Sequence, residues 1–169
     1  NPFRPVPPSR AVDEVRTLVE ATGPVLVHFL DNAMSPSLLE DVARSCLGIP
    51  WYGFVRITPH LADPDFCGAL KKSGCVMLKL GIESGDQDVL DRLQKGIDIG
   101  LASRALRELS KAGIGTYVYL LFGTPPETLE KARGTLDFVK AHSDFIGFLN
   151  LAIFNMPIHG PDAEKWGTT

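Results

Sequence analysis

The sequence predicts an α/β protein with parallel strands and outer helices, either part of a TIM-like (β/α) barrel or a small open sheet. Apolar strand-like runs alternate with helical patterns along the 169 residues, and each connection is long enough for a crossover helix. The strand-like runs are also largely apolar rather than alternating, which is typical of a parallel sheet with helices packed on it. A full eight-unit barrel needs about 250 residues. Five predicted strands therefore indicate an open arc of a barrel or a small open sheet.

The elements follow from apolar runs and from the residues that interrupt them. Strands are predicted at 25–30, 51–57, 75–82, 116–122 and 145–154. Helices are predicted after Ser9, at 35–46, from Asp63 to Gly74, and at 86–93, 99–112 and 127–141. Ser9 and Asp63 are the expected N-caps. Proline-rich residues 1–8 are expected to form an extended lead-in, and residues 158–169 an irregular tail.

Composition and charge argue against several partners. The net charge is −3, from 17 basic and 20 acidic residues, which gives no electrostatic support for binding nucleic acid or an anionic membrane. No apolar run reaches the ~18 residues of a membrane-spanning helix, and the first residues lack the apolar core of a secretory signal. We therefore expect a cytoplasmic protein. Because the first residue is Asn1 rather than Met, we expect this chain to be part of a longer one.

The three cysteines do not predict a metal site or a disulfide framework. Cys46, Cys67 and Cys75 lack the close spacing of zinc or cluster ligands, and their number is odd. We expect them to be small buried hydrophobic residues. The sequence accordingly predicts no metal ligand in this chain.

Polar residues and glycine-containing turns follow the predicted strands, at the edge where parallel α/β folds bind ligands. These residues are Asp31, Asn32, Arg56, Glu83, Ser84, Gly123, Thr124, Pro125 and the segment 155–157. We expect Asp31, Arg56, Glu83 and Gly123 to converge at one end of the sheet. His28, inside the first strand, is more typical of a satisfied core histidine than of a residue lining a substrate cavity.

Four segments carry a family resemblance. They read HFLDNAMS, WYGFVRI, SGCVMLKLGIESGDQDVLDRLQKG and KAGIGTYVYLLFGTPPETLEKARGTLDFVK. Their order and spacing, from about Ser9 to Pro157, resemble radical S-adenosylmethionine (SAM) enzymes, especially the branch that often carries an upstream cobalamin-binding domain. The family's fold is a six-strand partial barrel, and the resemblance implies that this chain holds the second to sixth strands.

The resemblance also implies a cofactor set. Family members hold a [4Fe–4S] cluster with a C-x-x-x-C-x-x-C segment after the first strand and cleave SAM to a 5′-deoxyadenosyl radical. Nothing in this chain matches that segment, so its thiolates are expected upstream of Asn1 and the isolated chain is expected to be inactive. Cobalamin in an upstream domain stays open. Methyl transfer, methylthiolation and ring rearrangement also stay open, and no substrate or catalytic residue is identified.

The first implied SAM contacts lie after the first and third strands. Asp31 and Asn32 would face the methionyl ammonium, although the family more often has two acidic residues there. Their alternative role is a turn or helix entry. Glu83 would accept hydrogen bonds from the ribose hydroxyls or the amino group, and its alternative is a solvated loop carboxylate. Ser84 fits helix entry better than ligand contact.

The remaining implied contacts are basic residues and a turn. Arg56 would pair with the SAM carboxylate or with Glu83, and a structural ion pair is the alternative. Lys95 would reach the same carboxylate, with a solvated helix-end lysine as the alternative. Gly123, Thr124 and Pro125 would let the backbone approach the adenine or its ribose. Pro126 replaces a family glycine there, and Glu127 is expected in the first helical turn.

Two alternative functions and the oligomeric state of the fragment remain open at this point. A cluster-free binding module of the same fold would share every feature above. An unrelated phosphate-binding barrel is disfavoured, because no glycine-rich phosphate loop follows the last strand. The strand at 25–30 should be a sheet edge, and because an unpaired apolar edge invites pairing, we expect the fragment either to form an edge-strand dimer or to need another chain segment there.

Overall fold

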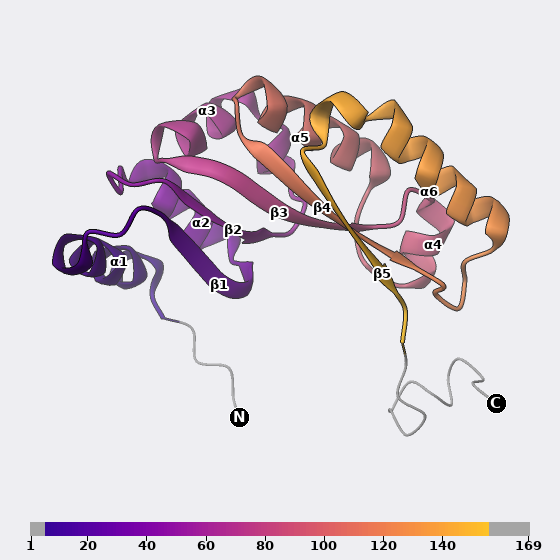
Figure 1. The fold of residues 1–169 in the computed structure, drawn as a ribbon, viewed down its shortest axis with the longest axis horizontal. Helices are drawn as coiled ribbons and strands as arrows, with labels where there is room; N and C mark the ends of the chain where they lie inside the picture. The colour runs from indigo at the N-terminus through magenta and orange to yellow at the C-terminus, as the bar shows by residue number, and fades with distance from the viewer. Residues whose placement is uncertain (1–5, 156–169) are drawn as a thin grey trace.

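The computed structural model describes residues 6–155 and confirms the α/β arc of a partial barrel. Its single sheet has five parallel strands in the order in which they occur in the chain: β1 (Val27–Met34), β2 (Trp51–Val55), β3 (Cys75–Glu83), β4 (Gly115–Phe122) and β5 (Phe148–Ile153). The helices are α1 (Pro8–Thr22), α2 (Pro36–Arg44), α3 (Pro64–Lys72), α4 (Gln87–Arg92), α5 (Ile99–Lys111) and α6 (Leu129–Ala141), with short 3₁₀ turns η1 (Pro59–Ala62) and η2 (Ser143–Phe145). The helices lie along the outer side of the curved sheet (Figure 1).

The two faces of the sheet differ in burial. On the outer face the core packs beneath the helices, and Trp51, Leu78 and Leu80 are fully buried there. The Trp51 indole N–H donates to the carbonyl and hydroxyl oxygens of Ser73, so the polar atom of this large core side chain is satisfied. Side chains of the inner face stay partly exposed, because no helix of the described residues covers them.

The first strand differs most from its prediction. Val25 and Leu26 precede β1 and are exposed, whereas β1 continues through Asp31 and Asn32 to Met34. Met34 is buried and pairs with Val55 of β2, after a register irregularity that begins at Phe29. Its thioether packs where a Cβ on Gly53 would stand, 2.6 Å from Met34 Sδ. This long-range contact extends the strand past its two polar residues.

Local signals predicted most helix starts correctly. Ser35 caps α2 and Asp63 caps α3, each accepting a backbone N–H through its side chain. Ser9 is not an N-cap, because α1 already begins at Pro8 and has no side-chain cap. The extended lead-in therefore ends before Pro8; its residues 1–5, and the segments 156–157 and 158–169, lie outside the described residues.

Both outer strands of the sheet have an unpaired edge within the described chain. β1 is an edge, as predicted, and β5 is the other. Leu151 and Ile153 on β5 are 65% and 83% exposed, so its apolar side chains are not covered by residues 6–155. Edge-strand dimerisation through β1 stays a prediction.

Candidate functional site

A cleft of about 850 Å³ opens at the carboxyl ends of β1, β2 and β3. Among the residues that line it are Asn32, Arg56, Glu83 and Lys95. Asn32 comes from β1, Arg56 directly follows β2, Glu83 ends β3 and Lys95 lies between α4 and α5. The parallel sheet thus brings four of the predicted contacts around one space, although they are far apart in sequence.

Glu83 is held in an unusual backbone conformation at the end of β3. Its φ is +70°, in the left-handed region that a residue with a Cβ rarely adopts, and the Ser84 N–H donates back to the Ile82 carbonyl oxygen at 2.9 Å. A Cβ on Gly81 would stand 2.9 Å from Glu83 Oε1. Glycine at position 81 therefore leaves the space that the Glu83 carboxylate occupies. Backbone strain of this kind is found at functional sites, where surrounding contacts maintain it.

The contacts that maintain this turn come from α6, about fifty residues further along the chain. Thr135 Oγ1 accepts a hydrogen bond from the Gly85 N–H at 3.0 Å and lies 3.2 Å from the Ser84 hydroxyl. Thr135 and Ser84 are buried. A Cβ on Gly85 would stand 2.7 Å from Phe138 Cβ and 2.8 Å from Thr135 Cα, so only glycine lets α6 pack this closely. We call Ser84, Gly85 and Thr135 the α6 clamp.

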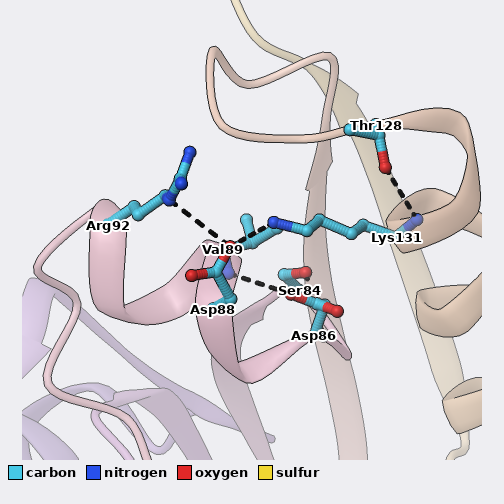
Figure 2. A network of polar contacts seen from close by, with 7 residues as sticks. All are labelled: Ser84, Asp86, Asp88, Val89, Arg92, Thr128 and Lys131. Atoms are coloured by element: carbon cyan, nitrogen blue, oxygen red, sulfur yellow. Dashed lines mark hydrogen bonds and ion pairs between the residues drawn. The ribbon is translucent and has the colours of Figure 1, made fainter.

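A polar network beside the clamp joins α4 to α6 (Figure 2). The Lys131 ammonium pairs with Asp88, and Arg92 lies 3.4 Å from the same carboxylate. The hydrogen bond from Lys131 holds the pKa of Asp88 below its ordinary value, and Arg92 adds to this effect. Asp86 caps α4 through the Val89 N–H. Asp88 and Arg92 are exposed, so their ion pair within α4 contributes little stability, and the pair with Lys131 is the one that joins the two helices.

Other predicted contacts lie outside the cleft lining. Gly123, Thr124 and Pro125 follow β4 but do not line the cleft. Gly123 has a φ of +74°, and its N–H donates to Glu127 Oε2 at 2.5 Å. Glu127 is therefore not in the first helical turn, because α6 starts at Leu129 with Thr128 as its N-cap.

The side chains of Ser84 and Asp31 are also directed elsewhere. The Ser84 hydroxyl serves the α6 clamp and accepts the Asp86 N–H, in agreement with a helix-entry role. Asp31 lines a smaller cavity next to the cleft. Of the four residues expected to converge, Arg56, Glu83 and Gly123 lie at the carboxyl ends of β2, β3 and β4, whereas Asp31 lies within β1. Only Arg56 and Glu83 line the cleft.

The basic residues of the cleft are available to a ligand. Lys95 Nζ lies 3.9 Å from Glu83 Oε1, which is an ion pair but too long for a hydrogen bond. None of the ion pairs formed within residues 6–155 includes Arg56, so the expected pair with Glu83 is absent there. Arg56 is exposed at the cleft. The cleft therefore offers a carboxylate, an amide and two cations to a zwitterionic ligand.

His28 is not a core histidine. It is exposed on the inner face, stacks on Tyr52 with ring centroids 4.1 Å apart, and lies 3.1 Å from Lys79 Nζ through its Nε2 atom. Partial burial and the Lys79 ammonium lower the pKa of His28. The sequence carried a signal that the sheet has a second, more polar face. Lys79 in β3 and Tyr119 in β4 each stand between two apolar residues, and those neighbours are fully or almost fully buried.

The cysteines lie away from the cleft. Cys67 is inside α3 and Cys75 begins β3, at the opposite end from Glu83. Burial raises the pKa of Cys67 to about 11 and that of Cys75 to about 12, so both are protonated thiols near neutral pH. Cys46, expected to be buried, is exposed after α2. In the part of the chain that the structure describes, no three His, Cys, Asp or Glu residues gather to hold a metal ion.

No helix within residues 6–155 combines the length and apolar character that crossing a bilayer requires.

The chain is similar to known proteins in sequence and in fold. It is 27% identical over 136 residues to the anaerobic magnesium-protoporphyrin IX monomethyl ester cyclase of Rubrivivax gelatinosus, covering 76% of this chain and 24% of that protein. It is also 27% identical over 137 residues to the bacteriochlorophyllide d C-12(1)-methyltransferase of Chlorobaculum tepidum, covering 76% and 29%. The chain thus spans roughly a quarter of the length of these relatives.

A solved structure shares the fold. The radical SAM methyltransferase TsrM of Kitasatospora setae, solved with cobalamin and a [4Fe-4S] cluster, superposes with a TM-score of 0.76 at 20% identity, over 94% of this chain and 33% of TsrM. The family model of the radical SAM superfamily matches residues 1–139. Because this match includes most of the chain, with its GIESG segment, the chain belongs to the radical SAM superfamily.

Proposed function

We propose that this chain provides the SAM-binding part of an enzyme that cleaves SAM to a 5′-deoxyadenosyl radical. The observation that carries the proposal is Glu83, a carboxylate fixed in a strained turn at the edge of the cleft. A solvated loop residue needs no such conformation, whereas a ligand-binding carboxylate benefits from having its position fixed before the ligand arrives.

The residues of the cleft fit the polar groups of SAM. The exposed Arg56 guanidinium and the Lys95 ammonium suit the methionyl carboxylate. The Asn32 side-chain oxygen suits the methionyl ammonium, with Asp31 nearby on the same strand. Glu83 accepts hydrogen bonds from ribose hydroxyls. The cleft volume of about 850 Å³ also falls within the ~300–1,000 Å³ that is typical of small-molecule sites.

The described residues do not fit an iron–sulfur cluster. A cluster needs thiolates brought together, whereas Cys67 and Cys75 are buried, protonated and remote from the cleft. The proposal therefore places the cluster ligands in a part of the full protein outside this chain. We extend it to a cobalamin-binding domain outside this chain, since the similar TsrM structure contains cobalamin.

The first experiment is calorimetric titration of the purified chain with SAM. We expect saturable binding that Glu83→Gln weakens by about tenfold or more, because this change replaces a charged acceptor by a neutral one of the same shape. Glu20→Gln, at an exposed position of α1, is the matched control and should bind like the wild type. Equal affinity of the Glu83→Gln variant and the wild type would contradict the proposed cleft.

A second experiment separates the enzyme from a cluster-free binding module. The chain is treated anaerobically with iron and sulfide, then with SAM and dithionite, and the product is analysed by chromatography. We expect no 5′-deoxyadenosine from this chain alone, but formation of it when a C-x-x-x-C-x-x-C segment from the same gene is joined upstream. Product from the chain alone would refute the assignment of the cluster to another segment. No such segment in the gene would favour the binding module.

A further inference from the structure

The inner face of the sheet carries a group of aromatic rings around a cation that SAM binding does not use. We call this group the inner-face cluster, and it consists of His28, Tyr52, Phe54, Lys79 and Tyr119. Lys79 Nζ lies 5.1 Å from the centroid of the Tyr52 ring, and Tyr52 stacks on His28. The rings of Phe54 and Tyr119 pack edge to face, with their centroids 5.5 Å apart. Phe54 and Tyr119 thus present aromatic rings, and Lys79 one ammonium group, to the same space.

Lys79 lacks an anionic partner among the described residues. It stands in the middle of β3, the central strand of the sheet, and its side chain is partly buried on the inner face. None of the ion pairs within residues 6–155 includes Lys79, although Asp31 lines the same cavity. Its described polar contact is with the ring of His28, whose lowered pKa favours the neutral form. The ammonium is therefore free to pair with an anion that enters the cavity.

The cluster lines a cavity that adjoins the SAM cleft. His28, Phe54, Lys79 and Tyr119 are among the residues around this space of about 240 Å³. Asn32 and Phe54 line both the cavity and the cleft, so a molecule in the cavity would lie beside bound SAM. Because the cavity is smaller than the ~300–1,000 Å³ of sites for drug-sized ligands, it suits a group of one or two rings.

We propose that this cavity binds the substrate, and that the substrate is a planar aromatic molecule bearing a carboxylate. The identification as substrate rests on the proposed SAM function; the ligand chemistry rests on the cluster itself. The rings of Phe54 and Tyr119, which line the cavity, favour an aromatic group through stacked or edge contacts. The carboxylate pairs with Lys79, and a charge-assisted hydrogen bond of this kind is stronger than a neutral one.

The test measures the binding of three probes to the purified chain by calorimetry. 2-Naphthoate has both features, 2-naphthylmethanol lacks the charge, and decahydro-2-naphthoate lacks the aromatic rings. We expect 2-naphthoate to bind at least about tenfold more tightly than either of the others, since each lacks one of the two interactions. Equal affinity for the three probes, or no binding of 2-naphthoate at millimolar concentration, would overturn the proposed ligand class.

Variants assign the preference to the cluster. Lys79→Met keeps the length of the side chain and should abolish the preference for 2-naphthoate over 2-naphthylmethanol. Lys79→Gln is the second variant, used if the first does not fold, and should have the same effect. Tyr119→Leu should weaken both naphthyl probes but keep the carboxylate preference. Lys111→Met, on the exposed side of α5, is the matched control and should bind like the wild type. A preference that persists without the charge of Lys79 would overturn the proposal.

A SAM titration of the same samples separates the two proposals. If 2-naphthoate binds in a way that depends on Lys79 but SAM does not bind at all, the proposed SAM function is overturned. The cavity would then still be a site for aromatic carboxylates, but its ligand would not be the substrate of a SAM-dependent reaction. SAM binding that depends on Glu83, without a Lys79-dependent preference among the probes, would overturn the substrate class alone. Both proposals are supported when each ligand responds to its own variant.

Discussion

Thr135→Val tests whether the α6 clamp holds the Glu83 turn. Valine has nearly the shape of threonine but lacks the hydroxyl, so the Gly85 N–H loses its acceptor and the Ser84 hydroxyl loses its partner. A buried polar group left without a partner costs about 1–3 kcal/mol. Because the Asp86 N–H still bonds to Ser84, we expect the free energy of unfolding to fall by about 2 kcal/mol. For a chain of this size, that corresponds to roughly 4–8 °C in Tm.

The assay is urea unfolding followed by circular dichroism, with Thr17→Val as the matched control. Thr135 and Thr17 each donate a side-chain hydroxyl to the carbonyl four residues earlier, but Thr17 lies on the exposed face of α1, so its replacement should cost less than about 0.5 kcal/mol. Thr135→Val should also weaken SAM binding, because the clamp adjoins Glu83 although Thr135 does not line the cleft. If both variants unfold at the same urea concentration as the wild type, the clamp does not stabilise the turn.

Three further predictions concern packing, protonation and thiol reactivity. Gly85→Ala should destabilise the chain by about 1–3 kcal/mol in urea unfolding, because its Cβ would overlap α6, whereas Gly68→Ala has open space within a helix and should be neutral or stabilising. Destabilisation by both substitutions alike would disprove the packing argument. The pKa of His28 is lowered in the folded chain, so the unfolded chain binds more protons and the free energy of unfolding should decrease as the pH falls through 6.5. Lys79→Met should raise the pKa of His28 in an NMR titration of its ring protons; a lower pKa in that variant would contradict the assigned contact. With a thiol-alkylating reagent at pH 8, Cys46 should react in the native chain and the two buried thiols only after unfolding, as mass spectrometry of peptides would show. Equal labelling of all the thiols in the native chain would contradict their described burial.

The order and type of the elements could be predicted because their signals are local. Apolar runs separated by capping residues and glycines place the five strands and six helices within a few residues of their positions in the structure. Ser35 and Asp63 cap helices through atoms two or three residues away. The carboxyl-end location of Glu83 and Arg56 follows from the parallel order alone.

Signals were misleading where a specific contact outweighs the general preference of a residue type. Asp31 and Asn32 look like a strand end, but pairing with β2 and the packing of Met34 over Gly53 carry β1 past them. Glu127 looks like a first-turn residue, but its carboxylate accepts the Gly123 N–H instead. The first outcome depends on a contact between distant segments, whereas the second depends on a turn within a few residues that the helical pattern does not reveal.

The sequence by itself determined the family, the alternation of strands and helices, and the edge of the sheet at which ligands would bind. Only the tertiary structure decided which of those strand-end residues share a cleft, because that depends on where each loop turns after its strand. It also decided the role of GIESG: Gly85 is glycine because α6 packs against it, and Glu83 is strained because Thr135 holds the next two residues. These contacts join segments about fifty residues apart, and their energies arise only after the sheet has brought the segments together.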